Sequence, residues 1–381
     1  MKFLIVSHVK HKRHNGRYYA YGPYVREMNL WFKYVDEVIV VAPLEEAEPD
    51  AIDLPYEHER IDFRPVPAFN LIGLSNKLRT LAKLPGIVKE IYGGMRDADH
   101  IHLRCPGNMG LLGCLVQALF PDKPKTAKYA GNWDPDAQGQ PVSYRLQRRL
   151  LASERFAKHM RVLVYGEWKD QSRNVVPFFT ATYSESEIDR SEEETLIERR
   201  KEAQEIGLLF VGALSTGKRP MLAVQTAHRL LRKGHRVRLD LYGEGSERAA
   251  LERYMAAHGL EDTVTLHGNR DAETLIAAYK RAHFLLFASR SEGWPKVVAE
   301  AMFWGCLPVT TAVSCVPYMV GEGARGALVD PSVEAMSEAV ERYVNDPALC
   351  AQSRREAMRW SRQFTLERFE KEIGRLLDEK R

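Results

Sequence analysis

Two glutamates that could bind a sugar stand where an apolar strand gives way to a helix. Glu292 follows the apolar run that ends at Ala288. Glu300 lies in the amphipathic stretch that begins at Pro295, a residue favoured at the first helical position. An α-helix rises about 1.5 Å per residue, so one carboxylate is expected at the helix start and the other about a turn and a half along. Ionised carboxylates accept strong hydrogen bonds, and this spacing leaves room for a ribose or a hexose.

The start of the same predicted helix suits a phosphate. The first amides of a helix lack intrahelical partners, and the helix dipole adds partial positive charge there. We therefore expect the segment after Gly293 to bind a phosphate through the backbone amides of Trp294, Lys296 and Val297, with the Lys296 ammonium adding charge. A hydrolase with paired carboxylates is the competing interpretation, and it depends on how far apart the carboxylates lie.

A second phosphate-binding pattern is found in GLLFVGALSTGKRPMLAV. An apolar strand leads into a turn with Gly212, two cations follow at Lys218 and Arg219, and a helix is expected from Pro220. A strand-to-helix turn with free amides and a lysine is suited to a diphosphate. Further along the chain, HGNRDAETL places His267 at a strand end, where it is either a contact for a base or ribose or a histidine with a structural partner.

The first half of the chain offers further candidate ligand contacts. HKRHNGRYYAYGPYV follows the first predicted strand, and we interpret it as a ligand-binding loop around Gly16. In KYAGNWDPD, Asn132 is a candidate hydrogen-bond partner for a sugar hydroxyl, and Trp133 is a candidate stacking face. Asp134 belongs to the same segment.

We expect neither a metal nor a cofactor. The N-terminal histidines, His8, His11 and His14, fall in a basic, turn-like segment without a carboxylate. The DPD sequence from Asp134 to Asp136 lies in the first half of the chain, far in sequence from both phosphate-binding patterns. The five cysteines form no CxxC pair, and this usage favours buried thiols in a reducing compartment.

The distribution of apolar residues predicts an α/β chain of two tandem Rossmann-like, doubly wound domains that face a central cleft. The charged and polar run SESEIDRSEEETLIERRKEAQE marks the boundary between residues 1–190 and 191–361. A final amphipathic helix, about 362–381, is expected to pack back on the first domain. The predicted elements of that domain include a strand over TATYSE and a helix near Tyr144–Lys158.

Composition places the chain among soluble proteins. Hydrophobic residues make up 45% and charged residues 28%, and no apolar run approaches the roughly 18 residues that a membrane span needs. The formal charge of +4 is carried by residues 1–190, because the rest of the chain is balanced. So small an excess does not indicate a nucleic-acid-binding protein. We expect a cytoplasmic protein whose first half meets an anionic partner or surface.

The stretch around Glu292 and Glu300 closely resembles the Glu-x7-Glu motif of the retaining, family 4 glycosyltransferases of the GT-B fold. The resemblance continues through EAM and GCLPVTT, and it covers Leu208 to about Pro331. It implies that Glu292 contacts the hydroxyls of the donor sugar and Glu300 the nucleotide ribose. Lys218 matches the family lysine. Ala213 stands where the family has an arginine, and Arg219 is its candidate replacement.

The resemblance implies a reaction as well. A UDP- or GDP-linked sugar, which is a substrate and not a cofactor, would donate a hexosyl group to a carbohydrate or lipid-linked acceptor, with retention of configuration and without a metal. Lys218 and Arg219 would stabilise the leaving diphosphate. The first half would bind the acceptor, with Gly16 near the acceptor or the donor phosphate and with Asn132, Trp133 and Asp134 on the acceptor side. Relatives often carry a histidine where Asn132 to Asp134 stand here, and a di-glycine near Gly16. Synthesis of cell-surface polysaccharides or glycoconjugates is the expected setting.

The segment Tyr144–Arg161 is basic and amphipathic. It either covers the sheet as a helix with a solvated face or contacts the anionic inner leaflet of the cell membrane. Alternatives for the whole chain stay open as well. They are a nucleotide-sugar epimerase or phosphorylase of the same fold, a sugar-binding protein and a nicotinamide-dependent oxidoreductase. The last is disfavoured because the first strand runs into SHVKHKRHNG and not into GxGxxG.

Overall fold

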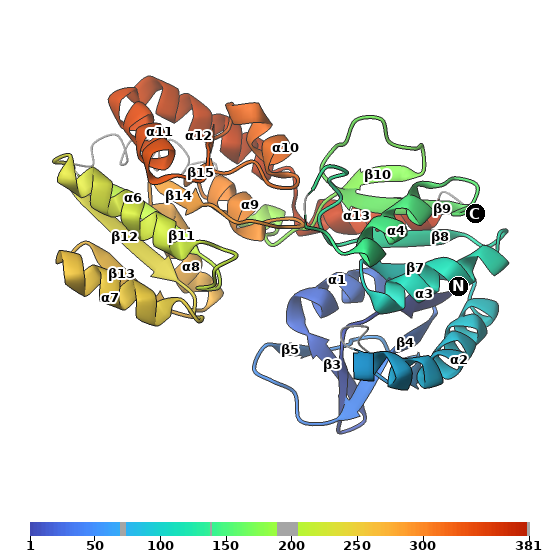
Figure 1. Cartoon of the computed structure of the whole chain (residues 1–381). Coiled ribbons are helices and arrows are strands. Elements are labelled where there is room, and N and C mark those ends of the chain that lie inside the picture. Colours follow the sequence, from blue (N-terminus) through green and yellow to red (C-terminus); the bar gives the residue numbers. More distant parts are fainter. Residues whose placement is uncertain (69–73, 138, 189–204, 379–381) are drawn as a thin grey trace. The chain divides into compact units, whose positions relative to one another are not determined.

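The computed structural model describes residues 1–68, 74–137, 139–188 and 205–378, which divide into two compact units (Figure 1). The first unit comprises Met1–Phe178 and Phe369–Arg381, and the second comprises Phe179–Arg368. The division thus falls before the charged run, of which residues 189–204 lie outside the described part of the chain. No helix among the described residues is long and apolar enough to cross a membrane.

A mostly parallel sheet forms the centre of the first unit, in the order β10-β9-β8-β7-β1-β4-β2-β3-β5, with β6 paired to β4. Its strands are β1 (Lys2–Val6), β2 (His11–His14), β3 (Arg17–Tyr21), β4 (Glu37–Glu46), β5 (Asp53–Pro55), β6 (Ile61–Val66), β7 (His100–Cys105), β8 (Lys125–Tyr129), β9 (Met160–Tyr165) and β10 (Val175–Phe178). Phe3 to Val6 are fully buried, as expected for a parallel strand covered on both faces.

Helices cover both faces of this sheet. On one face Leu4 and Val6 join a core with α2 (Leu74–Asp97), α3 (Asn108–Val116) and α4 (Val142–Ala152). On the other face Phe3 stacks with Trp31 of α1 (Gly22–Phe32) at 5.7 Å between ring centroids. Apolar side chains on alternate strand positions therefore fill two cores, one on each side of the sheet.

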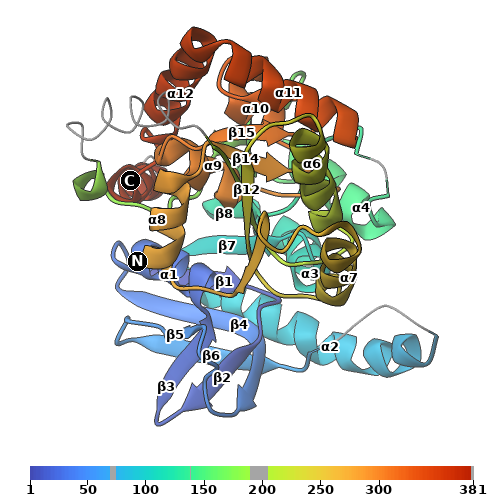
Figure 2. The same ribbon diagram turned by 90° about the vertical axis from the view of Figure 1, so that its left-hand side faces the viewer.

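The segment interpreted from the sequence as a ligand loop is a β-hairpin (Figure 2). Strands β2 and β3 pair antiparallel, and Asn15 and Gly16 at the tip have φ of 49° and 75°. Both residues are thus left-handed, and an Asn-Gly pair in this conformation is a strong hairpin signal. The interpretation as a loop was wrong because this local turn chemistry was overlooked.

Two other predicted elements of the first half also need correction. TATYSE is not a strand. The last strand of the first unit, β10, ends at Phe178, and the 3₁₀-helix η2 (Glu185–Glu187) follows. The helix expected near Tyr144–Lys158 is α4, which starts at Val142 and ends at Ala152. A second 3₁₀-helix, η1 (Gln117–Leu119), continues α3.

The described part of the second unit has a six-stranded parallel sheet in the order β13-β12-β11-β14-β15-β16. The strands are β11 (Ile206–Val211), β12 (Val237–Tyr242), β13 (Val264–Gly268), β14 (Phe284–Phe287), β15 (Leu307–Thr310) and β16 (Ala327–Leu328). The helices are α6 (Pro220–Arg232), α7 (Arg248–His258), α8 (Ala272–Arg281), α9 (Lys296–Phe303), α10 (Val316–Val320), η3 (Gly321–Gly323), α11 (Val333–Asn345) and α12 (Pro347–Ser361). Figure 2 shows α6 and α8 on opposite sides of the sheet. The doubly wound α/β prediction is confirmed.

The last helix, α13 (Leu366–Asp378), packs on the first unit from Phe369 onward. Phe369 contacts Phe178 at 5.4 Å between ring centroids, and Glu370 pairs with Lys33 at 2.8 Å. Gly374 lies so close to Tyr34 that a Cβ would be 3.0 Å from its ring. A side chain at this position would therefore press on Tyr34.

Candidate functional site

The Gly-containing turn after β11 is held by a second Gly-rich turn. Leu214 donates its amide to the Glu244 carbonyl at 2.9 Å, and Gly212 donates to Tyr242 at 2.9 Å. A Cβ on Gly243 would lie 2.0 Å from the Gly212 oxygen, and one on Gly245 would lie 2.4 Å from the Leu214 oxygen. Both glycines are therefore required for this close backbone approach, which fixes the turn that leads to Lys218.

Lys218 and Glu292 form an ion pair between the turns that follow β11 and β14. Two further contacts join the same turns: Arg290 donates its amide to the Gly217 carbonyl at 2.9 Å, and Arg219 donates to the Ala288 carbonyl at 3.2 Å. The structure thus brings the predicted diphosphate lysine and the predicted sugar carboxylate together at the carboxyl ends of adjacent strands.

Arg219 stands at the start of α6 in a left-handed conformation, with φ of 52°. Burial, and then the charge of Arg290, lower the pKa of its guanidinium from the ordinary value. The positive charges of Arg219 and Arg290 therefore lie close enough to repel each other. Arg290 was not among the predicted site residues, although it lies two residues before Glu292 in the same motif.

Glu300 is partly buried on α9, and both of its carboxylate oxygens accept hydrogen bonds. Thr182 donates its hydroxyl at 3.0 Å and Tyr279 donates at 3.1 Å. Burial raises the pKa of the carboxyl above its usual value, and the two hydroxyl donors oppose that rise. An oxygen that already accepts one hydrogen bond still has a second lone pair for a ligand hydroxyl.

Helix α9 begins at Lys296, one residue later than predicted, with Pro295 as its N-cap residue. The side chain of Pro295 makes no capping hydrogen bond to this end of the helix. Trp294 is buried, and its indole packs at 5.7 Å from the Phe364 ring centroid. The indole is thus a core side chain, and only the backbone of Trp294 fits the predicted role.

Two donors hold the loop in front of α9. Ser314 donates its hydroxyl to the Gly293 carbonyl at 3.1 Å, and the Cys315 thiol lies 3.2 Å from the same oxygen. These contacts fix the turn between Glu292 and the helix start. They come from a segment about twenty residues further along the chain.

His267 has a structural partner. Its Nε2 lies 2.6 Å from the Asp240 carboxylate, which Arg281 also contacts at 3.0 Å, and its ring stacks on Tyr242 at 4.4 Å. Of the two alternatives for His267, a ligand contact or a histidine with a structural partner, this geometry fits the second. A ligand contact would have to use the ring face or Nδ1.

In the first unit, Trp133 is unsuited to stacking on a sugar. Its side chain is 1% exposed, lies edge-on to Tyr129 at 4.9 Å and donates its indole N–H to Gln171 at 2.8 Å. The stacking prediction is corrected on this ground. Asn132 is partly exposed, and its carboxamide oxygen accepts the amide of Asp134 at 2.9 Å, which leaves its NH₂ for an acceptor hydroxyl.

The N-terminal histidines do not form a metal site, and the described residues contain no cluster of His, Cys, Asp or Glu suited to one. His11 is buried, and burial lowers its pKa to about 4, while its Nε2 lies 2.7 Å from the Tyr56 hydroxyl. His14 bonds to Asn15 at the hairpin tip, where Gly16 also lies. Gly16 has no neighbour within 4 Å of an added Cβ, and its role near a ligand stays a prediction.

Residues 191–360 match the family model described as glycosyl transferases group 1. The alpha-D-kanosaminyltransferase of Streptomyces kanamyceticus is 29% identical over 143 residues, which is 37% of each chain. A D-inositol 3-phosphate glycosyltransferase of Mycolicibacterium smegmatis is 33% identical over 124 residues, 32% of this chain and 28% of that protein. The chain thus spans about a third of the length of these curated relatives.

Solved structures match over nearly the whole chain. HepE of Anabaena, solved with UDP and glucose, superimposes with a TM-score of 0.67 at 16% identity and covers 99% of both chains. Sucrose-phosphate synthase from Thermosynechococcus elongatus gives 0.66 at 18% identity, over 100% of this chain and 98% of that one. At such identities the likeness establishes the fold. The chain therefore has the GT-B glycosyltransferase fold, and its residues 191–360 match the glycosyl transferases group 1.

Proposed function

We propose that this protein is a retaining glycosyltransferase that moves a hexosyl group from a nucleotide-sugar to an acceptor hydroxyl without a metal. The observation that carries the proposal is the Lys218–Glu292 ion pair at the start of α9, the helix that also bears Glu300. A donor has a diphosphate between its sugar and its ribose. A cation paired with one carboxylate, followed by a helix that carries the other, suits that order of groups.

Each group of the donor then has a partner in the second unit. The diphosphate binds Lys218, with Arg219 nearby, and the amides of Lys296 and Val297 at the α9 start. Glu292 accepts hydrogen bonds from the sugar, and Glu300 accepts them from the ribose. Donor binding separates Lys218 from Glu292, because each then contacts its own part of the donor.

In the reaction, the bond between the anomeric carbon and the diphosphate oxygen breaks as the acceptor oxygen bonds to that carbon on the same face. The leaving diphosphate takes up the electron pair, and the charge it gains is stabilised by Lys218 and the α9 amides. The acceptor proton passes to a phosphate oxygen. No side-chain nucleophile or metal is needed in this scheme.

The donor is proposed to be UDP- or GDP-linked. HepE, of the same fold, is described in complex with UDP-glucose. A Xanthomonas campestris relative, 25% identical over 177 residues, is named as a GDP-mannose-dependent alpha-mannosyltransferase that acts on cellobiosyl-diphosphopolyprenol. The latter name also supports a lipid-linked acceptor. We propose a role in the synthesis of cell-surface polysaccharides or glycoconjugates.

Measuring nucleotide release tests the activity. Incubation with a matching donor and a carbohydrate or lipid-linked acceptor should release nucleoside diphosphate in proportion to glycosylated product. Conversion of the donor sugar without acceptor would indicate an epimerase of the same fold, and binding without turnover would indicate a sugar-binding protein.

A lipid-linked acceptor would bring the first unit to a membrane surface. Six of its large apolar side chains are exposed on α2, the α3–η1 segment and α4: Val88, Tyr92, Leu115, Leu119, Val142 and Leu146. Arg145 and Arg149 on α4 are exposed as well. Arg148 is not counted with these exposed side chains, because its guanidinium donates to the Asp134 carbonyl at 2.6 Å. We propose a cytoplasmic enzyme that contacts the inner leaflet peripherally.

Changing Arg145 and Arg149 to Glu should weaken binding to anionic liposomes. Each basic residue near such a surface contributes about 1 kcal/mol, so losing two should cost about 2 kcal/mol, and high salt should release the parent protein. Sedimentation at low and high salt measures both effects. The control carries Arg253→Glu and Arg359→Glu on the second unit and should bind as the parent does. Absent or salt-independent binding by the parent would contradict the membrane proposal.

A further inference from the structure

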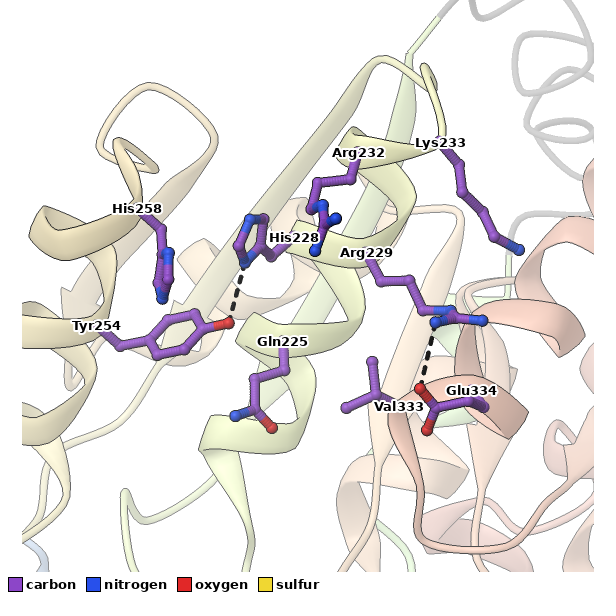
Figure 3. Close-up of a pocket in the computed structure, with 9 residues that line it drawn as sticks. All are labelled: Gln225, His228, Arg229, Arg232, Lys233, Tyr254, His258, Val333 and Glu334. Carbon is purple, nitrogen blue, oxygen red and sulfur yellow. Dashed lines mark hydrogen bonds and ion pairs between the residues drawn. The ribbon is translucent and has the colours of Figure 1, made fainter.

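The second unit contains a cavity of about 530 Å³ that the proposed reaction does not use (Figure 3). It lies between the C-terminal half of α6, helix α7 and the start of α11, and none of the proposed donor contacts lines it. Its volume is within the range of roughly 300–1,000 Å³ typical of small-molecule sites.

Cations line one side of the cavity. Arg229 and Arg232 are three residues apart on α6, so they lie on adjacent turns of one helix face. Arg229 pairs with Glu334 at 3.2 Å, yet its buried Nε has no hydrogen-bond partner among the described residues. Arg232 is exposed, and its guanidinium forms no hydrogen bond or ion pair within the described part of the chain. The charge of the Arg232 guanidinium is therefore not neutralised, and the Arg229 Nε–H is a donor without an acceptor among the described residues.

Rings form the other side. His228 Nδ1 lies 2.9 Å from the Tyr254 hydroxyl, and His258 lies 4.8 Å from the His228 ring and 4.4 Å from the Tyr254 ring, between centroids. Burial, and then the charges of His258 and Arg232, lower the pKa of His228, so this imidazole is neutral near pH 7. Figure 3 shows the three rings gathered beside Arg232. They offer flat faces to an organic group.

We propose that this cavity binds a small phosphate monoester, with its phosphate at Arg229 and Arg232 and its organic group on the rings of His228, Tyr254 and His258. Guanidinium groups bind phosphate through parallel N–H donors, and Arg232 is available for such contacts. A lone phosphate ion would leave the ring side of the cavity unfilled. This site goes beyond the proposed function and does not depend on it.

Calorimetric titration of the full chain with ribose 5-phosphate tests the site, with ribose and inorganic phosphate as matched probes. Ribose 5-phosphate should bind at least tenfold more tightly than either. Arg232→Gln should lower that affinity at least tenfold, and His258→Ala should lower it while leaving the weak binding of inorganic phosphate unchanged. Arg253→Gln, an exposed change on α7 outside the cavity, should have no effect.

The donor site could also attract a phosphate ester, so Lys218→Ala is titrated in parallel and should retain full affinity. Loss of binding in Lys218→Ala together with its retention in Arg232→Gln would place the probe at the donor site and overturn the proposal. Equal binding of ribose 5-phosphate and inorganic phosphate would overturn the role of the rings. No measurable binding of ribose 5-phosphate would overturn the site itself.

Discussion

Lys218→Ala should lower kcat by about 10²–10³-fold and change donor KM much less. The leaving diphosphate gains negative charge in the transition state, so a cation beside it stabilises that state more than the bound donor. Steady-state nucleotide release with the matching donor measures both constants. Arg359→Ala, which removes a cation from an exposed pair with Glu356, is the control and should leave both unchanged.

The ion pair between Lys218 and Glu292 allows a double-variant test of the same claim. Because Lys218 and Glu292 are in contact, their effects should not add: the double variant should lose less activity than the product of the single losses. Glu292→Ala should lower kcat while affinity for the free nucleoside diphosphate is spared. A Lys218→Ala enzyme with unchanged kcat and a raised KM would show that the lysine only binds the ground state.

Glu27→Gln should destabilise the first unit by about 3–5 kcal/mol. Glu27 on α1 is 7% exposed and contacts two cations, the partly buried Arg104 of β7 at 3.1 Å and the fully buried Lys128 of β8 at 3.4 Å. Removing the carboxylate charge leaves both cations without this compensation in a medium of low polarity. Lys128 also lies 5.0 Å from the Phe369 ring centroid, so the loss should loosen the attachment of α13.

Hydrogen exchange read by mass spectrometry separates the two units. Peptides from β1 should lose protection in Glu27→Gln, whereas peptides from β11 in the second unit should keep it. Glu46→Gln breaks an exposed pair with Arg13 by the same substitution and should change neither set. Unchanged exchange in β1 would show that the buried pair adds nothing to stability.

The order of strands and helices could be predicted because buried parallel strands are continuous apolar runs. GLLFVGAL and HFLLFAS are two such runs, and they became β11 and β14. The β2–β3 hairpin was missed because its strands carry basic and aromatic residues, and its signal is the two-residue Asn15-Gly16 turn. Helix α12 was missed because its mixed polar sequence lacks a clear apolar stripe.

Within the candidate site, the contacts that are local in sequence could be predicted and the distant ones could not. Glu292 and Glu300 share one motif, and Lys218 follows a Gly-containing turn. No sequence signal joins Thr182 and Tyr279 to Glu300, because that contact arises only when the chain folds. Burial of Trp133 was equally hidden, since a tryptophan in a polar loop does not reveal whether its ring points inward.

Thermal unfolding with UDP-, GDP- and ADP-linked sugars and their free diphosphates tests the central claim, that the second unit binds a nucleotide-sugar through Glu300. One nucleotide should raise the melting temperature of the parent chain, because a ligand stabilises only the state that binds it. Glu300→Ala should weaken that binding by about 1–3 kcal/mol, since the ribose hydroxyls lose their acceptor. Glu338→Ala, an exposed change on α11, should respond as the parent does. A parent that responds to no nucleotide, or a Glu300→Ala chain that responds equally, would contradict the account.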